Sequence, residues 1–189
     1  MDGFSPTAEG IVKLVPSCNK LDYTPRHWHR DNYLISTEPA LIQVDAVNAA
    51  LSTDAMWWAK SLPRDLLKKA LHNSLSFGLY ALPQPDSNGS NSNGTKQVGL
   101  ARVITDDVTF AYLSDVYILP EHQGKGLGRW LLECLDEVIK DWPHLRRFMF
   151  LTTDAMDFYR KTLGAKEWSE FKTGATKIGM VEGPGAPSH

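Results

Sequence analysis

The feature of the sequence that most constrains the fold is a glycine-rich loop set between a strand-like run and a helical stripe. The run 115–119 is rich in β-branched and aromatic residues, and Gly124, Gly126 and Gly128 follow it at every second position. Glycines allow a backbone to approach a ligand closely, and a helix N-terminus offers unpaired N–H groups to an anion. This unit therefore predicts a phosphate-binding loop. The helix should begin near Gly126, with an apolar face formed by Leu127, Trp130, Leu131, Cys134, Leu135 and Val138.

The spacing of this loop excludes two widespread nucleotide-binding motifs. A Walker A loop requires Ser or Thr after Gly-Lys, whereas Gly126 follows Lys125. The dinucleotide fingerprint requires a glycine at position 129, which is Arg129, and a strand from a βαβ unit. Here the short turn at 106–107 predicts a hairpin instead. The pattern that fits is Gln-x-x-Gly-x-Gly, from Gln123 to Gly128.

Hydrophobic periodicity gives the order of elements along the rest of the chain, β-α-α-β-β-β-α-β-α-β. Asp154 is the expected N-cap of the last helix, and Gly164 suits its C-terminal end. This order predicts an α+β fold, with helices packed against a sheet. The expected strands are 32–38, 75–82, 98–105, 108–119, 148–151 and 173–180, and the expected helices are 41–51, 63–71, the one from 126, and 154–161.

The length of 189 residues favours one domain with short decorations. Residues 1–31 are expected to be an irregular N-terminal extension, and 182–189 a flexible tail. The Ser-, Asn- and Gly-rich stretch 83–97 is expected to be a mobile polar loop inside the domain 32–181.

Composition and charge exclude several classes of function. A net charge of −2 and a pI near 6.3 argue against a dedicated nucleic-acid binder. The sequence has no 18-residue apolar run, so we expect no membrane span. The two cysteines cannot form a disulfide framework, and the six histidines lack the spacing of a metal site. The start of the chain lacks the layout of a signal peptide, so we expect a cytoplasmic protein, with the nucleus as an alternative.

A second motif supports a specific family. Residues 152–165, TTDAMDFYRKTLGA, resemble a late segment of the GCN5-related N-acetyltransferases (GNAT), and Gln123–Gly128 resembles the acyl-CoA loop of the same family. The match departs from the family pattern where Thr162 is inserted and Ala165 replaces an aromatic residue. The resemblance covers roughly residues 32–170. It implies a mixed, mostly antiparallel sheet with helices on both faces and splayed central strands that bind acyl-CoA.

The resemblance also implies how the donor, acetyl-CoA, is held. Val116, Tyr117 and Ile118 would pair with pantetheine through backbone groups. The side chains of Lys125 and Arg129 would add positive charge, or alternatively lie on a solvated surface. Backbone N–H groups of the loop would hold the pyrophosphate; the residues concerned are Gln123, Gly124, Lys125, Gly126, Leu127, Gly128 and Arg129.

Two residues are candidates for catalysis by the same resemblance. Tyr159 matches the family's proton donor to the CoA sulfur, the alternative being a packed aromatic residue. Asp115 lies where some relatives carry a carboxylate that faces the substrate, and it would act as a base, orient the amine, or work through water. A carboxylate in an apolar strand is costly without a partner, so a buried, hydrogen-bonded Asp115 is the alternative.

The acceptor is the least constrained part of the prediction. Tyr112 is a candidate for a water relay, and Trp57 or Trp58 would line the acceptor wall. The leading hypothesis is an acetyltransferase that acts on a small primary amine by direct attack in a ternary complex. A protein lysine or N-terminus as acceptor, and a CoA-binding module without turnover, are the alternatives. The sequence leaves a homodimer open.

Overall fold

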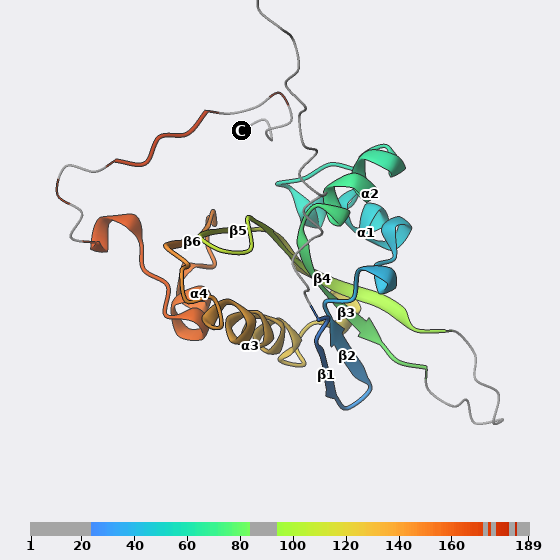
Figure 1. Cartoon of the computed structure of the whole chain (residues 1–189). Coiled ribbons are helices and arrows are strands. Elements are labelled where there is room, and N and C mark those ends of the chain that lie inside the picture. Colours follow the sequence, from blue (N-terminus) through green and yellow to red (C-terminus); the bar gives the residue numbers. More distant parts are fainter. Residues whose placement is uncertain (1–23, 84–93, 172–173, 175–176, 182–183, 185–189) are drawn as a thin grey trace, which may run out of the picture.

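The sheet runs in chain order from one edge to the other (Figure 1). The computed structural model describes residues 24–83, 94–171, 174, 177–181 and 184. All neighbouring strands pair antiparallel except β5 and β6, which pair parallel. This confirms the mixed, mostly antiparallel α+β sheet. The strands are β1 (His27–Arg30), β2 (Tyr33–Ser36), β3 (Leu75–Ala81), β4 (Lys96–Thr105), β5 (Phe110–Ile118) and β6 (Arg147–Phe150).

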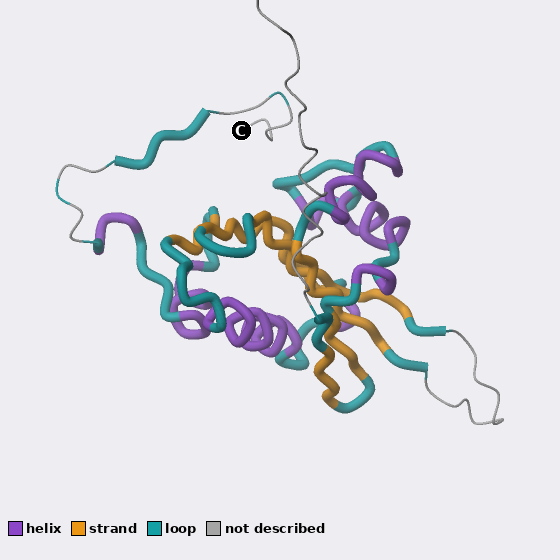
Figure 2. The backbone as a smooth tube through the Cα atoms, viewed as in Figure 1, coloured by secondary structure: helices purple, strands orange, loops and turns teal. Residues whose placement is uncertain are grey.

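Helices cover both faces of the sheet, as the sequence predicts (Figures 1 and 2). α1 (Val44–Leu51) and α2 (Arg64–His72) pack on one face, and α3 (Leu127–Lys140) and α4 (Met156–Leu163) on the other. In the described part of the chain, no helix is long and apolar enough to cross a membrane. Short 3-10 helices lie at Pro39–Leu41, Asp54–Met56, Pro120–His122 and Trp168–Glu170.

Two hydrophobic clusters hold the layers together. Under α3, the residues Leu131, Leu132 and Leu135 are fully buried against the sheet. Under α1 and α2, the sheet contributes Leu100 and Tyr117. Complete burial of one such aliphatic side chain stabilises a fold by about 1.5–3 kcal/mol, so the predicted stripe of α3 suffices to anchor that helix.

A β-bulge interrupts the pairing of β4 with β5. Ala101 lies opposite Val116, and Val103 lies opposite Leu113, so Arg102 faces the two residues 114–115. Before the bulge, Leu113 packs on the α3 side of the sheet. The extra residue shifts by one the alternation of side chains between the two faces of the sheet. After the bulge, Val116 and Ile118 therefore face α3, and Tyr117 faces α1 and α2.

The parallel pairing of β5 with β6 ends at this bulge. The last pair joins Leu113 to Phe150, and β5 continues through Ile118 without a strand on that side. In the described part of the sheet β6 is the edge strand, so the expected splay lies between this edge strand and β5, beyond the last pair.

The predicted boundary of the N-terminal extension is wrong. Residues 27–30 form β1, which pairs with β2 across a tight turn where Asp31 has a left-handed φ of 49°. Trp28 of this strand stacks on Phe77 with ring centroids 6.1 Å apart. The strand was missed because its four residues, HWHR, show no apolar periodicity, although two short runs around a two-residue turn are a hairpin signal.

Near the C-terminal end, the structure differs from the expected helix cap and last strand and agrees with the expected end of α4. Asp154 is not the helix cap, because Ala155 takes that position and donates its N–H to Thr152 Oγ1 at 3.2 Å. Gly164 ends α4 with a left-handed φ of 67°, as predicted. Residues 177–180 of the expected last strand form no strand. Most of the polar loop 83–97 and of the tail 182–189 lies outside the described residues.

Tyr80 buries a hydroxyl that has no hydrogen-bond partner among the described residues. Its ring lies over Gly78, and burial raises the pKa of its phenol. An unpaired buried hydroxyl costs about 1–3 kcal/mol, so we expect Tyr80→Phe to leave the fold intact and to raise the free energy of unfolding by about 1 kcal/mol in urea denaturation. Tyr33→Phe is the control, because the Tyr33 hydroxyl is hydrogen-bonded to Lys125 and His122 and its loss should not stabilise. A destabilised Tyr80→Phe variant would contradict this.

Candidate active site

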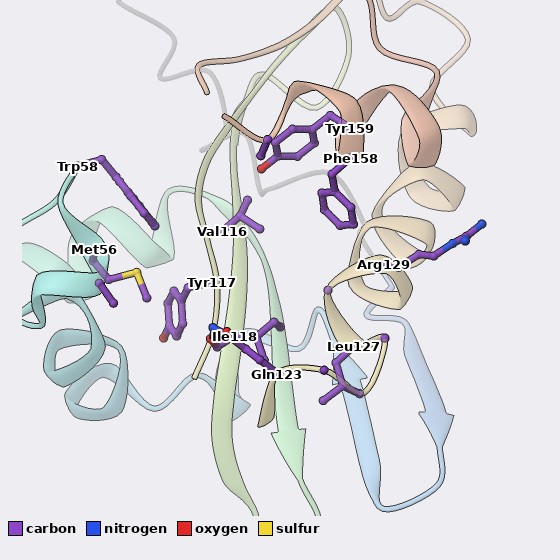
Figure 3. Close-up of a pocket in the computed structure, with 15 residues that line it drawn as sticks. Met56, Trp58, Val116, Tyr117, Ile118, Gln123, Leu127, Arg129, Phe158 and Tyr159 are labelled. Atoms are coloured by element: carbon purple, nitrogen blue, oxygen red, sulfur yellow. Dashed lines mark hydrogen bonds between the residues drawn. The ribbon is translucent and has the colours of Figure 1, made fainter. Parts of the chain in front are cut away.

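A cleft of about 450 Å³ opens along the end of β5, beyond the last pair of β5 with β6 (Figure 3). The end of β5 forms its floor, the glycine loop and the start of α3 close one end, and α4 forms one wall. The segment between α1 and α2 forms the opposite wall. The lining residues are Ala55, Met56, Trp58, Val116, Tyr117, Ile118, Gln123, Gly124, Gly126, Leu127, Gly128, Arg129, Ala155, Phe158 and Tyr159.

The glycine loop has the geometry of an anion site. Gly124 and Gly126 adopt left-handed φ values of 76° and 71°, which side-chain-bearing residues rarely take. Gly126 is the N-cap of α3 and supplies no side-chain cap. The N–H groups of residues 127–129 in the first turn therefore have no acceptor within the helix, and they suit a phosphate group.

The Gln123 side chain connects the glycine loop to the end of β5 by a hydrogen bond. Its side-chain Nε2 donates a hydrogen bond to the carbonyl of Ile118 at 2.8 Å. Its backbone N–H donates to the carbonyl of Pro120 at 3.1 Å. The amide side chain thus has an internal partner, and its contribution to the site is to hold the loop against the end of β5.

The two basic side chains of the loop have protein partners. Lys125 Nζ donates to the Tyr33 hydroxyl at 3.1 Å, and Arg129 Nε donates to Glu133 Oε1 at 2.9 Å. Arg129 lines the cleft, whereas Lys125 does not. Both pairs are exposed and therefore weak, so both cations can turn toward a bound anion.

Tyr159 combines a packed ring with a hydroxyl at the cleft. The ring lies against Phe150 with centroids 4.3 Å apart, and the residue is 9% exposed. Figure 3 shows its hydroxyl directed toward β5 on the side of Val116. Burial raises the pKa of the phenol, so the group is protonated at neutral pH and can donate a proton. The packed-aromatic and proton-donor interpretations of Tyr159 are therefore compatible.

Asp115 and Tyr112 lie outside the cleft. Asp115 Oδ2 accepts a hydrogen bond from Arg102 Nε at 2.7 Å, and the two side chains are only 13% and 16% exposed. The bulge turns Asp115 away from α3 and α4. Its charge is balanced by Arg102, which corresponds to the buried, hydrogen-bonded alternative that the sequence left open. Burial and the charge of Asp115 raise the pKa of Tyr112.

Of the two adjacent tryptophans, one lines the cleft and the other lies at the surface. Trp58 lines the cleft, and Trp57 lies outside it with 52% of its surface exposed. Their rings meet edge to face with centroids 5.9 Å apart.

Sequence reasoning missed Met56 and Phe158, although Phe158 directly precedes Tyr159 within the motif that identified that residue. Among the described residues, no group of three or more His, Cys, Asp or Glu side chains could hold a metal ion.

Comparisons with known proteins agree with this geometry. The model of the acetyltransferase (GNAT) family matches residues 53–165. FG08082 of Gibberella zeae, a protein assigned as an acetyltransferase, is 54% identical over 169 residues, which cover 86% of this chain and 96% of that protein. Histone acetyltransferase TAP1 of Glycine max is 30% identical over 119 residues, which cover 62% of this chain and 50% of TAP1.

A solved structure gives the same result. A Xanthomonas campestris pv. campestris protein assigned to the GNAT family superimposes with a TM-score of 0.59 and 34% identity, over 74% of this chain and 87% of that one. These relatives are acetyltransferases by name, so an enzyme is supported over a module without turnover. The family model, the relatives and the cleft at the splayed strands together show that this chain belongs to the GNAT family of acetyltransferases.

Proposed function

We propose that this protein transfers the acetyl group of acetyl-CoA to a primary amine of a small molecule by direct attack in a ternary complex. The observation that carries this proposal is the continuity of the cleft. Along one cavity, the N–H groups of the glycine loop are followed by the Tyr159 hydroxyl and then by the aromatic wall at Trp58. Donor, proton donor and acceptor would then occupy successive parts of it.

The residues of the cleft suit acetyl-CoA, which supplies the acetyl thioester. The first turn of α3 would hold the pyrophosphate, because its N–H groups and the helix dipole favour negative charge. The edge of β5 at 116–118 is not covered by β6, so its backbone groups are available to the amides of pantetheine. Gly128 borders the passage between Ile118 and Phe158, where a Cβ would fit at ordinary contact distance, 3.9 Å from each side chain, and a longer side chain would fill the space.

The Tyr159 hydroxyl would supply the proton that the leaving thiolate needs. The amine nitrogen forms a bond to the acetyl carbon, the carbon–sulfur bond breaks, and the Tyr159 hydroxyl gives the sulfur a proton. The proton of the amine leaves to solvent through the open cleft, and solvent returns a proton to the Tyr159 phenolate. A lysine-like amine with a pKa of about 10.4 must first lose a proton at neutral pH. We infer that a relay of water serves this step, because no carboxylate lines the described cleft.

The acceptor wall favours an apolar amine. Met56, Trp58 and Tyr117 form its surface, and Arg129 is the one charged residue among those that line the described cleft. Arg102 neutralises Asp115, which lies outside the cleft, so Asp115 provides no negative charge that would attract a cationic amine. The proposal of an alkyl or aromatic primary amine therefore rests on apolar contact, with a cation–π contribution from Trp58.

A protein acceptor is the second candidate. It is favoured by the similarity to a plant protein named as a histone acetyltransferase. The net charge of −2 gives little long-range attraction toward a highly basic peptide, which is why a small amine is preferred.

Substitutions at Gly128 test the donor site. Gly128→Ala adds a Cβ at ordinary contact distance and should preserve binding of acetyl-CoA. Gly128→Leu should fill the passage between Ile118 and Phe158 and weaken binding by at least about 10-fold, which corresponds to 1.4 kcal/mol. Titration calorimetry measures both, with Tm as the control for folding. Equal affinity of the two variants for acetyl-CoA would show that the donor does not occupy the passage beside Gly128.

Tyr159→Phe tests the proton donor. The ring and its packing on Phe150 are kept, so affinity for acetyl-CoA and Tm should change little. Turnover should fall by about 100-fold, the usual range for a lost general acid. Because the pKa of Tyr159 is raised, wild-type turnover should show no loss from its ionisation below about pH 10. Unchanged turnover in the variant would remove Tyr159 from the reaction.

The two tryptophans form a matched pair for testing the acceptor. Trp58→Ala should raise KM for an arylalkylamine by about 10-fold with KM for acetyl-CoA unchanged, whereas Trp57→Ala should affect neither. A thiol-release assay measures both, and the same assay compares kcat/KM for amines and histone peptides in the wild type. A clear preference for the peptides would favour the protein-acetyltransferase candidate.

A further inference from the structure

We propose that Arg102 is a positioning residue of the active site, whose guanidinium clamps the two bulged residues of β5 and so holds the cleft in its open shape. Arg102 itself does not line the cleft. The inference rests on the proposed function in one respect, namely that the cleft binds acetyl-CoA.

The contacts of Arg102 follow the geometry of the bulge. Arg102 is the single residue of β4 that faces residues 114–115 of β5. Its Nε donates to Asp115 Oδ2 at 2.7 Å, and its Nη2 donates to Ser114 Oγ at 3.2 Å. One planar group thus bonds both residues of the bulge at the same time.

A third bond attaches this clamp to the next layer. Arg102 Nη1 donates to Ser74 Oγ at 3.1 Å, and Ser74 in turn donates to the carbonyl of Ala70 in α2 at 2.7 Å. The guanidinium therefore connects β4, the bulge of β5 and the end of α2. Arginine suits this role because its donors are fixed in a plane, whereas the ammonium of lysine is a single point at the end of a flexible chain.

The ion pair of Arg102 with Asp115 is buried, so its loss would affect the structure more than the loss of a surface ion pair. The side chains of Arg102 and Asp115 are 16% and 13% exposed. Solvent screening is weak at such positions, and loss of one partner would leave the other charge buried alone. The pair therefore favours the bulged register over a regular one, in which these two charges would not meet.

The bulge decides what lies in the cleft. It brings Val116 and Ile118 to the side of α3 and α4, where they line the donor part, and it turns Tyr117 toward the acceptor wall. The pairing of β5 with β6 also ends there, at Leu113. A strand without the bulge would reverse these side chains, because a shift of one residue moves each of them to the other face.

The test replaces the buried pair by apolar residues, Arg102→Met with Asp115→Leu, because such replacements often preserve stability. We expect similar Tm but a Kd for acetyl-CoA raised at least about 10-fold in calorimetry, with a matching rise in its KM. Arg102→Lys keeps the charge without the planar fork, and it should show a smaller rise in Kd. The matched control is Arg64→Met with Asp45→Leu, an exposed pair with Nε–Oδ1 of 2.8 Å outside the cleft, which should bind as the wild type does.

The outcomes separate this proposal from the proposed function. If the wild type binds acetyl-CoA and the Arg102 variants bind equally well, the clamp is overturned while the function stands. If the paired variant does not fold, Arg102→Lys decides alone, and a wild-type Kd in that variant overturns the clamp. An equal loss in the Arg64 control would show a non-local effect and also overturn it. If the wild type does not bind acetyl-CoA, both proposals fail.

Discussion

The active-site cleft depends on one irregularity in the sheet, the point at which β5 gains a residue relative to β4 and separates from β6. The parallel ladder of β5 with β6 stops at the pair Leu113–Phe150, where β6 ends, and the backbone edge of β5 beyond this pair is not covered by β6. The bulge lies directly beyond that pair and exchanges the faces of the residues that follow. Backbone groups and side chains thereby become available to a ligand at the same place.

The glycine loop then extends this opening to the start of α3. Its position depends on β5, because the Gln123 side chain donates to the carbonyl of Ile118 at the end of that strand. Two left-handed glycines allow the chain to turn directly into the helix. An anion bound at the N-terminus of α3 would therefore have a defined position relative to a ligand that lies along β5. The Tyr159 hydroxyl projects into the same space from α4.

Local sequence was sufficient for the elements whose signals are carried by neighbouring residues. The loop from Gln123 to Gly128, the apolar stripe of α3 and the glycine that ends α4 all follow from spacing along a few turns of chain. β1 was missed because four residues without apolar periodicity form a strand only when β2 lies beside them. Asp154 was misassigned as a cap because the helix begins one residue later, with Ala155 at the N-cap, and the Asp154 carboxylate accepts a hydrogen bond from the Thr153 hydroxyl instead.

The sequence by itself determined the family, the order of the elements from β2 to α4 and the glycine loop at the start of α3, since these depend on residue types at short spacing. It also determined that a carboxylate in the strand of Asp115 needs a partner. Only the tertiary structure decided that this partner is Arg102, that Trp58 and not Trp57 lines the cleft, and that Asp115 points away from it. The physical reason is register: the side that a strand residue faces depends on its pairing with a neighbouring strand, and a single bulge changes that side for every residue after it.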